Sequence, residues 1–198
     1  MSNARNLPTT FTDEREEVDL TKYPTAKALV ERASEFFAEV KNMTPGQDLE
    51  KYLNENYGPG NPYYEDFCKY VRQGIKNNEG WCATIQIDGA RYRRSRVSLP
   101  KPATHHFSIT TVFMDSQEVY RGEYHSHPYG EINCVIQIDE GAELKGMKGW
   151  QGAGWTSPGA GTHHYPEVRK GAVVALYFLL AGRISFAANE SMPQPLIV

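Results

Sequence analysis

Two histidines and a glutamate in GEYHSHPYGEINCVIQI, residues 122–138, have the types and the spacing of a reactive site. Residues i and i+2 of an extended strand project to the same face, so His125 and His127 should point together. The Pro-Tyr-Gly turn that follows would return Glu131 beside them on the neighbouring strand. Imidazole and carboxylate groups form a ligand set that Fe, Mn, Zn and Ni ions accept. The stretch therefore predicts a divalent-metal site or an acid–base site, with a merely hydrogen-bonded polar hairpin as the alternative.

The elements that must position these side chains fall into two parts. Residues 1–80 are expected to be helical, because apolar residues recur at helical spacing in TAKALVERASEFFAEVKNM, residues 25–43. Two shorter helices are predicted at residues 47–56 and after Asn61-Pro62. Residues 1 to about 20 are polar and acidic, and are expected to form a draping arm.

Residues 81–198 are expected to form a β-barrel packed against the helices. From Trp81 onward, short runs rich in β-branched and aromatic residues are separated mostly by Gly, Pro, Asp or Asn. About nine such runs without a helix signal indicate an antiparallel sandwich or barrel. If Glu131 and Asn133 point into it, residues 132, 134, 136 and 138 form an outward apolar row. The helices or a second subunit should cover that row, so we expect a homodimer.

Composition excludes several classes of protein. The net charge of −3 gives no support to a nucleic-acid or membrane-surface role. The three cysteines contain no CxxC pair and are expected to be free thiols. The N-terminal residues lack the apolar core of a signal peptide, and the longest apolar run, residues 172–182, is too short to cross a bilayer. A cytoplasmic location is therefore expected.

Several further residues are candidates for substrate binding. In RYRRSRVS, Arg94 or Arg96 should reach into the barrel and hold an anion, unless the strand is only a solvated basic surface. His106, at the entry to a strand, is a candidate pocket residue. Aromatic walls suit a small planar ligand. The candidates for those walls are Tyr124 and Trp155, and Tyr129 in the turn is a further catalytic candidate; all three are also plausible as core or rim residues.

The HxHxxxE segment, followed by Pro158, Ala160 and His163 in a Pro-x-Ala-x-x-His pattern, resembles the two metal motifs of cupins. The resemblance implies a cupin-type antiparallel β-barrel, a double-stranded β-helix or jelly roll. It also implies that the first motif supplies two histidines and a glutamate to the metal and the second motif supplies one histidine. Ala160 departs from the pattern, because cupins usually have glycine there.

The histidine of the second motif is ambiguous, because His163 and His164 are adjacent and neighbouring strand residues face opposite ways. Counting from Pro158 favours His163, whereas counting from Gly161 favours His164. We expect the ligand set to be His125, His127, Glu131 and His163, with Glu131 and His164 as acid–base groups.

The whole arrangement is similar to that of the 4-hydroxylaminobenzoate lyases of bacterial nitroaromatic degradation. The similarity rests on the helical N-terminal segment followed by RYRRSRVSLP, GEYHSHPYGEINCVIQID, GWTSPGAGTHHYPEV and ALYFLLAGRISF. It implies conversion of 4-hydroxylaminobenzoate, a small aromatic carboxylate, to 3,4-dihydroxybenzoate (protocatechuate) with release of ammonia. A divalent ion of undetermined identity would polarise the hydroxylamine oxygen and supply hydroxide. In a metal-free alternative, Glu131 and a histidine would move the protons.

Three other functions fit the same residues. An Fe(II) cupin dioxygenase would consume oxygen, and a sugar-phosphate isomerase would use residues 91–96 as a phosphate clamp. A non-catalytic cupin would bind an aromatic acid without turnover. The reaction class that the resemblance implies is redox-neutral, in keeping with a sequence in which we find no Gly-rich nucleotide motif.

Overall fold

The computed structural model describes residues 17–82, 85–88 and 91–195, so most of the expected N-terminal arm lies outside the described residues. Three helices come first, namely α1 (Pro24–Val40), α2 (Gln47–Asn56) and α3 (Pro62–Lys76). Proline stands at the start of α1 and of α3, where its missing N–H is not needed. The side chain of Asn61 caps α3 by accepting a hydrogen bond from the backbone N–H of Tyr63. The predicted helices are confirmed.

The strands that follow form three antiparallel sheets. They are β1 (Ile85–Asp88), β2 (Tyr92–Ser98), β3 (Phe107–Ser116), β4 (Tyr120–Arg121), β5 (His125–Ser126), β6 (Ile132–Gln137), β7 (Glu143–Gly146), β8 (Gly149–Gln151), β9 (Gly154–Thr156), β10 (His163–His164), β11 (Glu167–Arg169) and β12 (Gly171–Leu180). The large sheet has the order β1-β2-β3-β12-β6-β9, and a second sheet has the order β4-β11-β7-β8. Strand β10 pairs with β5. The mainly β fold of antiparallel strands with N-terminal helices is thus confirmed, and the described strands form three sheets rather than one closed barrel.

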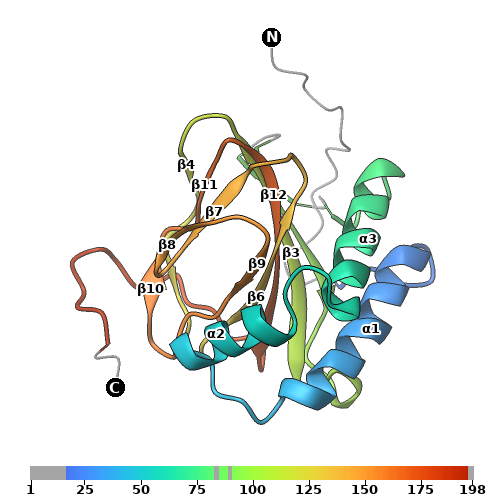
Figure 1. Ribbon diagram of the computed structural model, residues 1–198, viewed down its shortest axis with the longest axis horizontal. Helices are drawn as coiled ribbons and strands as arrows, with labels where there is room; N and C mark the ends of the chain where they lie inside the picture. Colours follow the sequence, from blue (N-terminus) through green and yellow to red (C-terminus); the bar gives the residue numbers. More distant parts are fainter. Residues whose placement is uncertain (1–16, 83–84, 89–90, 196–198) are drawn as a thin grey trace.

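The helices cover one face of the large sheet, as Figure 1 shows for α1 and α3. Ile132, Cys134 and Ile136 of β6 are buried in one core with residues of all three helices. The expected apolar row therefore exists, and the helices of the same chain cover it. Ile132, Cys134 and Ile136 are therefore covered without a second subunit, and the row gives no argument for the expected homodimer. Among the described residues, none of the helices combines the length and the apolar character that crossing a bilayer requires.

Glu167 joins three neighbouring strands of the second sheet. Its buried carboxylate on β11 accepts hydrogen bonds from Arg121 of β4 and from Nζ of Lys145 of β7, both at 2.7 Å. Burial by itself would raise the pKa of Glu167, but the hydrogen bonds from Lys145 and Arg121 hold the pKa below its ordinary value. The ionised form is therefore the one that stabilises the fold.

Replacing Glu167 by glutamine should lower the free energy of unfolding at pH 7 by about 1–3 kcal/mol, because it removes the charged partner of two cations. A depressed carboxyl pKa stabilises the fold above the unfolded-state pKa, and this stability is lost as the pH falls through the folded-state pKa. Urea unfolding should thus show a difference between the two proteins that shrinks below about pH 4. Glu140→Gln, at an exposed acid, is the matched control. Equal losses in the two variants would contradict this role.

Candidate metal centre

Three histidines converge at the two-stranded sheet formed by β5 and β10. Each of His125, His127 and His164 offers one ring nitrogen, and the three nitrogens lie within 4.8 Å of one another. The ring centroids are 4.9 Å apart for His125 and His127, and 5.1 Å apart for each of these with His164. Three imidazoles at such spacing, with a carboxyl group beside them, form a donor set for a divalent first-row ion.

The hydrogen bonds around the cluster leave a lone pair available on two of the rings. Nδ1 of His125 donates to the carbonyl of Glu123 at 2.9 Å, and Nδ1 of His127 donates to the carbonyl of Thr162 at 3.0 Å. Nε2 of each ring is therefore the unprotonated nitrogen. Nε2 of His127 is buried and has no hydrogen-bond partner among the described residues. Fixing the outer nitrogen on a carbonyl is how proteins orient metal-binding imidazoles, so these residues fit a metal ion.

The electrostatics of the cluster favour neutral imidazoles. Burial lowers the pKa of His125, and it lowers the pKa of His127 well below the ordinary value. Burial, with the neighbouring His125, lowers the pKa of His164 to about 3. All three rings are thus neutral at pH 7, the form in which imidazole binds a metal.

The pairing of β10 with β5 decides which histidine of the second motif joins the cluster. His164 lies opposite His125 and shares its face, whereas His163 lies opposite Ser126 on the other face. Nε2 of His163 donates to the carbonyl of Pro193 at 3.2 Å, and its Nδ1 accepts from the hydroxyl of Tyr124. Both ring nitrogens of His163 are engaged away from the cluster. The strand pairing thus places His164 in the cluster, where the sequence led us to expect His163.

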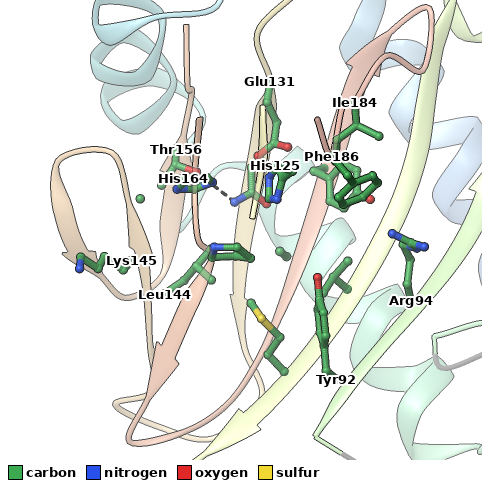
Figure 2. A pocket seen from close by; sticks show the side chains of 17 residues that line it. Tyr92, Arg94, His125, Glu131, Leu144, Lys145, Thr156, His164, Ile184 and Phe186 are labelled. Atoms are coloured by element: carbon green, nitrogen blue, oxygen red, sulfur yellow. Dashed lines mark hydrogen bonds between the residues drawn. The ribbon is translucent and has the colours of Figure 1, made fainter. Parts of the chain in front are cut away.

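Glu131 lies beside the cluster, immediately before β6. Its Oε2 lies 3.8 Å from Nε2 of His127, and its side chain is buried. Burial raises the pKa of Glu131 to about 8. In Figure 2 its carboxyl group points toward His125, as the return after the Pro-Tyr-Gly turn predicted.

A pocket opens from the cluster between the two larger sheets (Figure 2). His125, Glu131 and His164 line it together with Arg94 of β2. The remaining lining is largely apolar or aromatic, and it includes Tyr92, Met114, Leu144, Tyr177, Ile184 and Phe186. The Cζ atom of Arg94 lies 6.0 Å from the ring centroid of Phe186. The pocket thus holds a guanidinium and aromatic walls opposite the histidines, an arrangement suited to a small aromatic anion.

The other predicted site residues lie outside this pocket. Trp155 is fully buried in the core and stacks on Phe36 of α1 with ring centroids 5.1 Å apart. Tyr129 is 50% exposed at the tip of its turn. His106 is exposed in the loop before β3.

Arg96 and Tyr124 are likewise absent from the lining. Arg96 shares its strand face with Arg94. Its positive charge opposes part of the rise that burial causes in the pKa of Tyr177. Tyr124 contacts His163 and packs against Tyr165. Both residues therefore neighbour the site without lining the pocket.

Sequence reasoning missed the residues that the C-terminal segment contributes. Ser185 pairs with Ser126, donating and accepting backbone hydrogen bonds at 3.1 and 2.7 Å. This pairing brings Ile184 and Phe186 into the lining of the pocket. The only signal in the sequence is the apolar run of residues 172–182, which ends the strand pattern. That run does not reveal that the segment after it pairs at Ser126. Asn133 and Thr156 also line the pocket, and no motif in the sequence predicts a role for either side chain.

The chain matches the family described as PnbB, 4-hydroxylaminobenzoate lyase, over residues 31–186. It is 53% identical over 162 residues to a 4-hydroxylaminobenzoate lyase of Nocardioides sp. (strain LMS-CY), covering 82% of this chain and 95% of that protein. It is 51% identical over 160 residues to a 4-hydroxylaminobenzoate lyase of Pseudomonas putida, covering 77% of this chain and 90% of that protein.

Solved structures show more distant likenesses. An RmlC-like cupin protein from Ralstonia eutropha is 15% identical, with 60% of this chain and 71% of that chain covered and a TM-score of 0.42. The DMSP lyase DddQ from Ruegeria pomeroyi is 14% identical, with 85% and 99% covered and a TM-score of 0.41. Likenesses of this strength do not bear on substrate or metal.

Proposed function

The chain belongs to the 4-hydroxylaminobenzoate lyase family, and from this premise we propose that it converts 4-hydroxylaminobenzoate to 3,4-dihydroxybenzoate and ammonia in the pocket beside the three histidines. One observation carries the placement of the reaction. His125, His127 and His164 converge with available ring nitrogens at one end of a pocket that Arg94 also lines. That arrangement supplies a reactive centre and an anion-binding group in the same cavity.

His125, His127 and His164 would hold a divalent ion of the Fe, Mn, Zn or Ni type through their ring nitrogens. When bound, such an ion supplies a Lewis acid for the hydroxylamine oxygen and a water of lowered pKa. The protein holds the ligands in place through the carbonyls of Glu123 and Thr162, which fix the ring orientations.

Glu131 is the group that we assign to proton transfer. Cleavage of the N–O bond releases the oxygen as water, so a proton must reach that oxygen, and the carboxyl of Glu131 faces the pocket beside the histidines. The carboxylate that remains would take a proton from the water that adds to the ring carbon next to the nitrogen-bearing carbon. A second water hydrolyses the resulting C=N bond to C=O and releases ammonia. The hydroxylated ring carbon then loses its hydrogen as a proton and the carbonyl oxygen gains one, which restores the aromatic ring as 3,4-dihydroxybenzoate. One water is lost and two are added, so the net reaction consumes one water and needs no oxidant.

Arg94 is assigned to the carboxylate of the substrate. A guanidinium binds a carboxylate through two parallel N–H donors, and Arg94 lines the same pocket as the histidine cluster. Tyr92, Tyr177 and Phe186 would flank the planar ring and exclude bulk water from it. The ring would thus be held between the anion-binding arginine and the reactive centre.

Product analysis under nitrogen tests this function. We expect the protein to release ammonia and 3,4-dihydroxybenzoate from 4-hydroxylaminobenzoate in a one-to-one ratio, with equal rates in the presence and absence of oxygen. Chromatography of the aromatic product and an enzymatic ammonia assay give the ratio. Product that forms only with oxygen would overturn the lyase in favour of a dioxygenase, and 4-amino-3-hydroxybenzoate without ammonia would mean that the C=N bond is not hydrolysed.

A further inference from the structure

Asn133 presents an unused hydrogen-bond acceptor to the pocket. It is the second residue of β6 and follows Glu131, the residue just before the strand, by two positions; both side chains line the pocket. The residue is only 3% exposed. Its Oδ1 is buried and has no hydrogen-bond partner among the residues that the structure describes. A hydrogen-bond donor is expected at this atom. A buried acceptor without a partner has lost its hydrogen bonds to water and forms none in the protein, which costs free energy.

The neighbouring strand engages the amide nitrogen of Asn133. Asn133 lies opposite Thr156 in the β6–β9 ladder, and its Nδ2 donates to Oγ1 of Thr156 at 2.9 Å. The dashed line that reaches Thr156 in Figure 2 marks this bond. Because the amide nitrogen is engaged there, the carbonyl oxygen is the end that remains for a ligand. A donor must therefore come from a molecule in the pocket.

The proposed substrate carries a donor of this kind, and the inference that follows rests on the proposed function. We propose that Oδ1 of Asn133 accepts a hydrogen bond from the N–H of the hydroxylamino group and so selects this group against its more oxidised forms. Nitroso and nitro groups have no N–H, and their oxygens are acceptors. A nitroso or nitro group in this position would bring its own acceptor against Oδ1, which would then stay without a hydrogen bond. A site built to accept an N–H therefore binds analogues that lack it much more weakly.

The contact would also orient the bond that breaks. The nitrogen of the hydroxylamino group would face Asn133, which accepts its N–H. The oxygen would face Glu131, which donates the proton. Both residues line the same pocket. Asn133 is thus assigned as a specificity and positioning residue that contacts the substrate, and it transfers no proton.

The test compares two inert ligands of similar shape in the wild type and in Asn133→Leu. 4-Aminobenzoate offers N–H donors, and 4-nitrobenzoate offers only acceptors; calorimetry measures the dissociation constant of each. Asn133→Leu should weaken 4-aminobenzoate binding by about tenfold, the equivalent of one hydrogen bond. It should leave 4-nitrobenzoate binding unchanged or tighter. kcat/KM for 4-hydroxylaminobenzoate should fall about 10- to 100-fold.

Gln137→Leu is the matched control, because it removes an amide from the same strand at a residue outside the pocket lining. Thr156→Val, which frees the amide to rotate, should show a smaller change of the same sign. If folded Asn133→Leu changes the two dissociation constants equally, or changes neither, the proposed role of Asn133 is wrong. Turnover by the wild type would still support the lyase function in that case. A wild type that binds neither ligand and turns over no substrate would overturn both.

Discussion

Replacing His164 by alanine is expected to reduce turnover of 4-hydroxylaminobenzoate more than about 100-fold, because loss of a group that merely orients a ligand already costs 10- to 100-fold in metal affinity or activity. His164 is one of the three histidines whose ring nitrogens face one another. Its removal leaves two imidazoles and Glu131, and we expect the bound metal per chain to fall with the activity. Turnover under saturating metal and elemental analysis of the purified variant measure both effects.

His163→Ala is the matched control, one residue away. The ring of His163 contacts Tyr124 and Pro193 rather than the cluster. We therefore expect bound metal to stay at the wild-type level and turnover to fall less than about tenfold, as for a residue that supports the site from outside. The reverse result, with metal lost in His163→Ala and kept in His164→Ala, would contradict the ligand set proposed from the strand pairing.

Replacing Arg94 by methionine is expected to raise KM about 10- to 100-fold, because a hydrogen bond between charged groups contributes about 1.5–3 kcal/mol. The side chain keeps its apolar length but loses the two-pronged donor that faces the pocket. The rate at saturating substrate should change less, since the carboxylate is remote from the N–O bond and its binding is shared by ground state and transition state. Steady-state kinetics give the two parameters separately.

Arg96→Met distinguishes a specific contact from the general effect of positive charge. Arg96 lies on the same strand face but not in the pocket lining. Its replacement should raise KM less than about threefold, as expected for a screened charge near a site. Equal increases for the two variants would show that charge alone draws the anion in, and a rise in KM confined to Arg96→Met would place the carboxylate elsewhere.

The part of the site that sequence predicts is the part that depends on local geometry. His125 and His127 share a strand face because of the two-residue period, and the turn brings Glu131 back beside them. The helices are equally local, since proline starts, apolar spacing and the cap at Asn61 are all read within a few residues. These features need no knowledge of how distant segments pair.

The rest depends on the register between strands that are far apart in sequence. Trp155 faces the helices because it lies opposite Cys134, whereas the next residue, Thr156, lies opposite Asn133 and faces the pocket. A shift of one residue exchanges these faces, and nothing in GWT alone decides between them. The choice between His163 and His164 is of the same kind, and so is the entry of Phe186 through the pairing at Ser185.

The most direct test of the central claim is turnover of 4-hydroxylaminobenzoate by the wild-type protein before chelation, after complete removal of metal, and after addition of single divalent ions. We predict that the stripped protein forms no 3,4-dihydroxybenzoate and that one ion restores product at about one equivalent per chain, as three ligands in one cluster require. Unchanged turnover by protein shown to be metal-free would contradict the metal centre, and would leave the three histidines and Glu131 as an acid–base site.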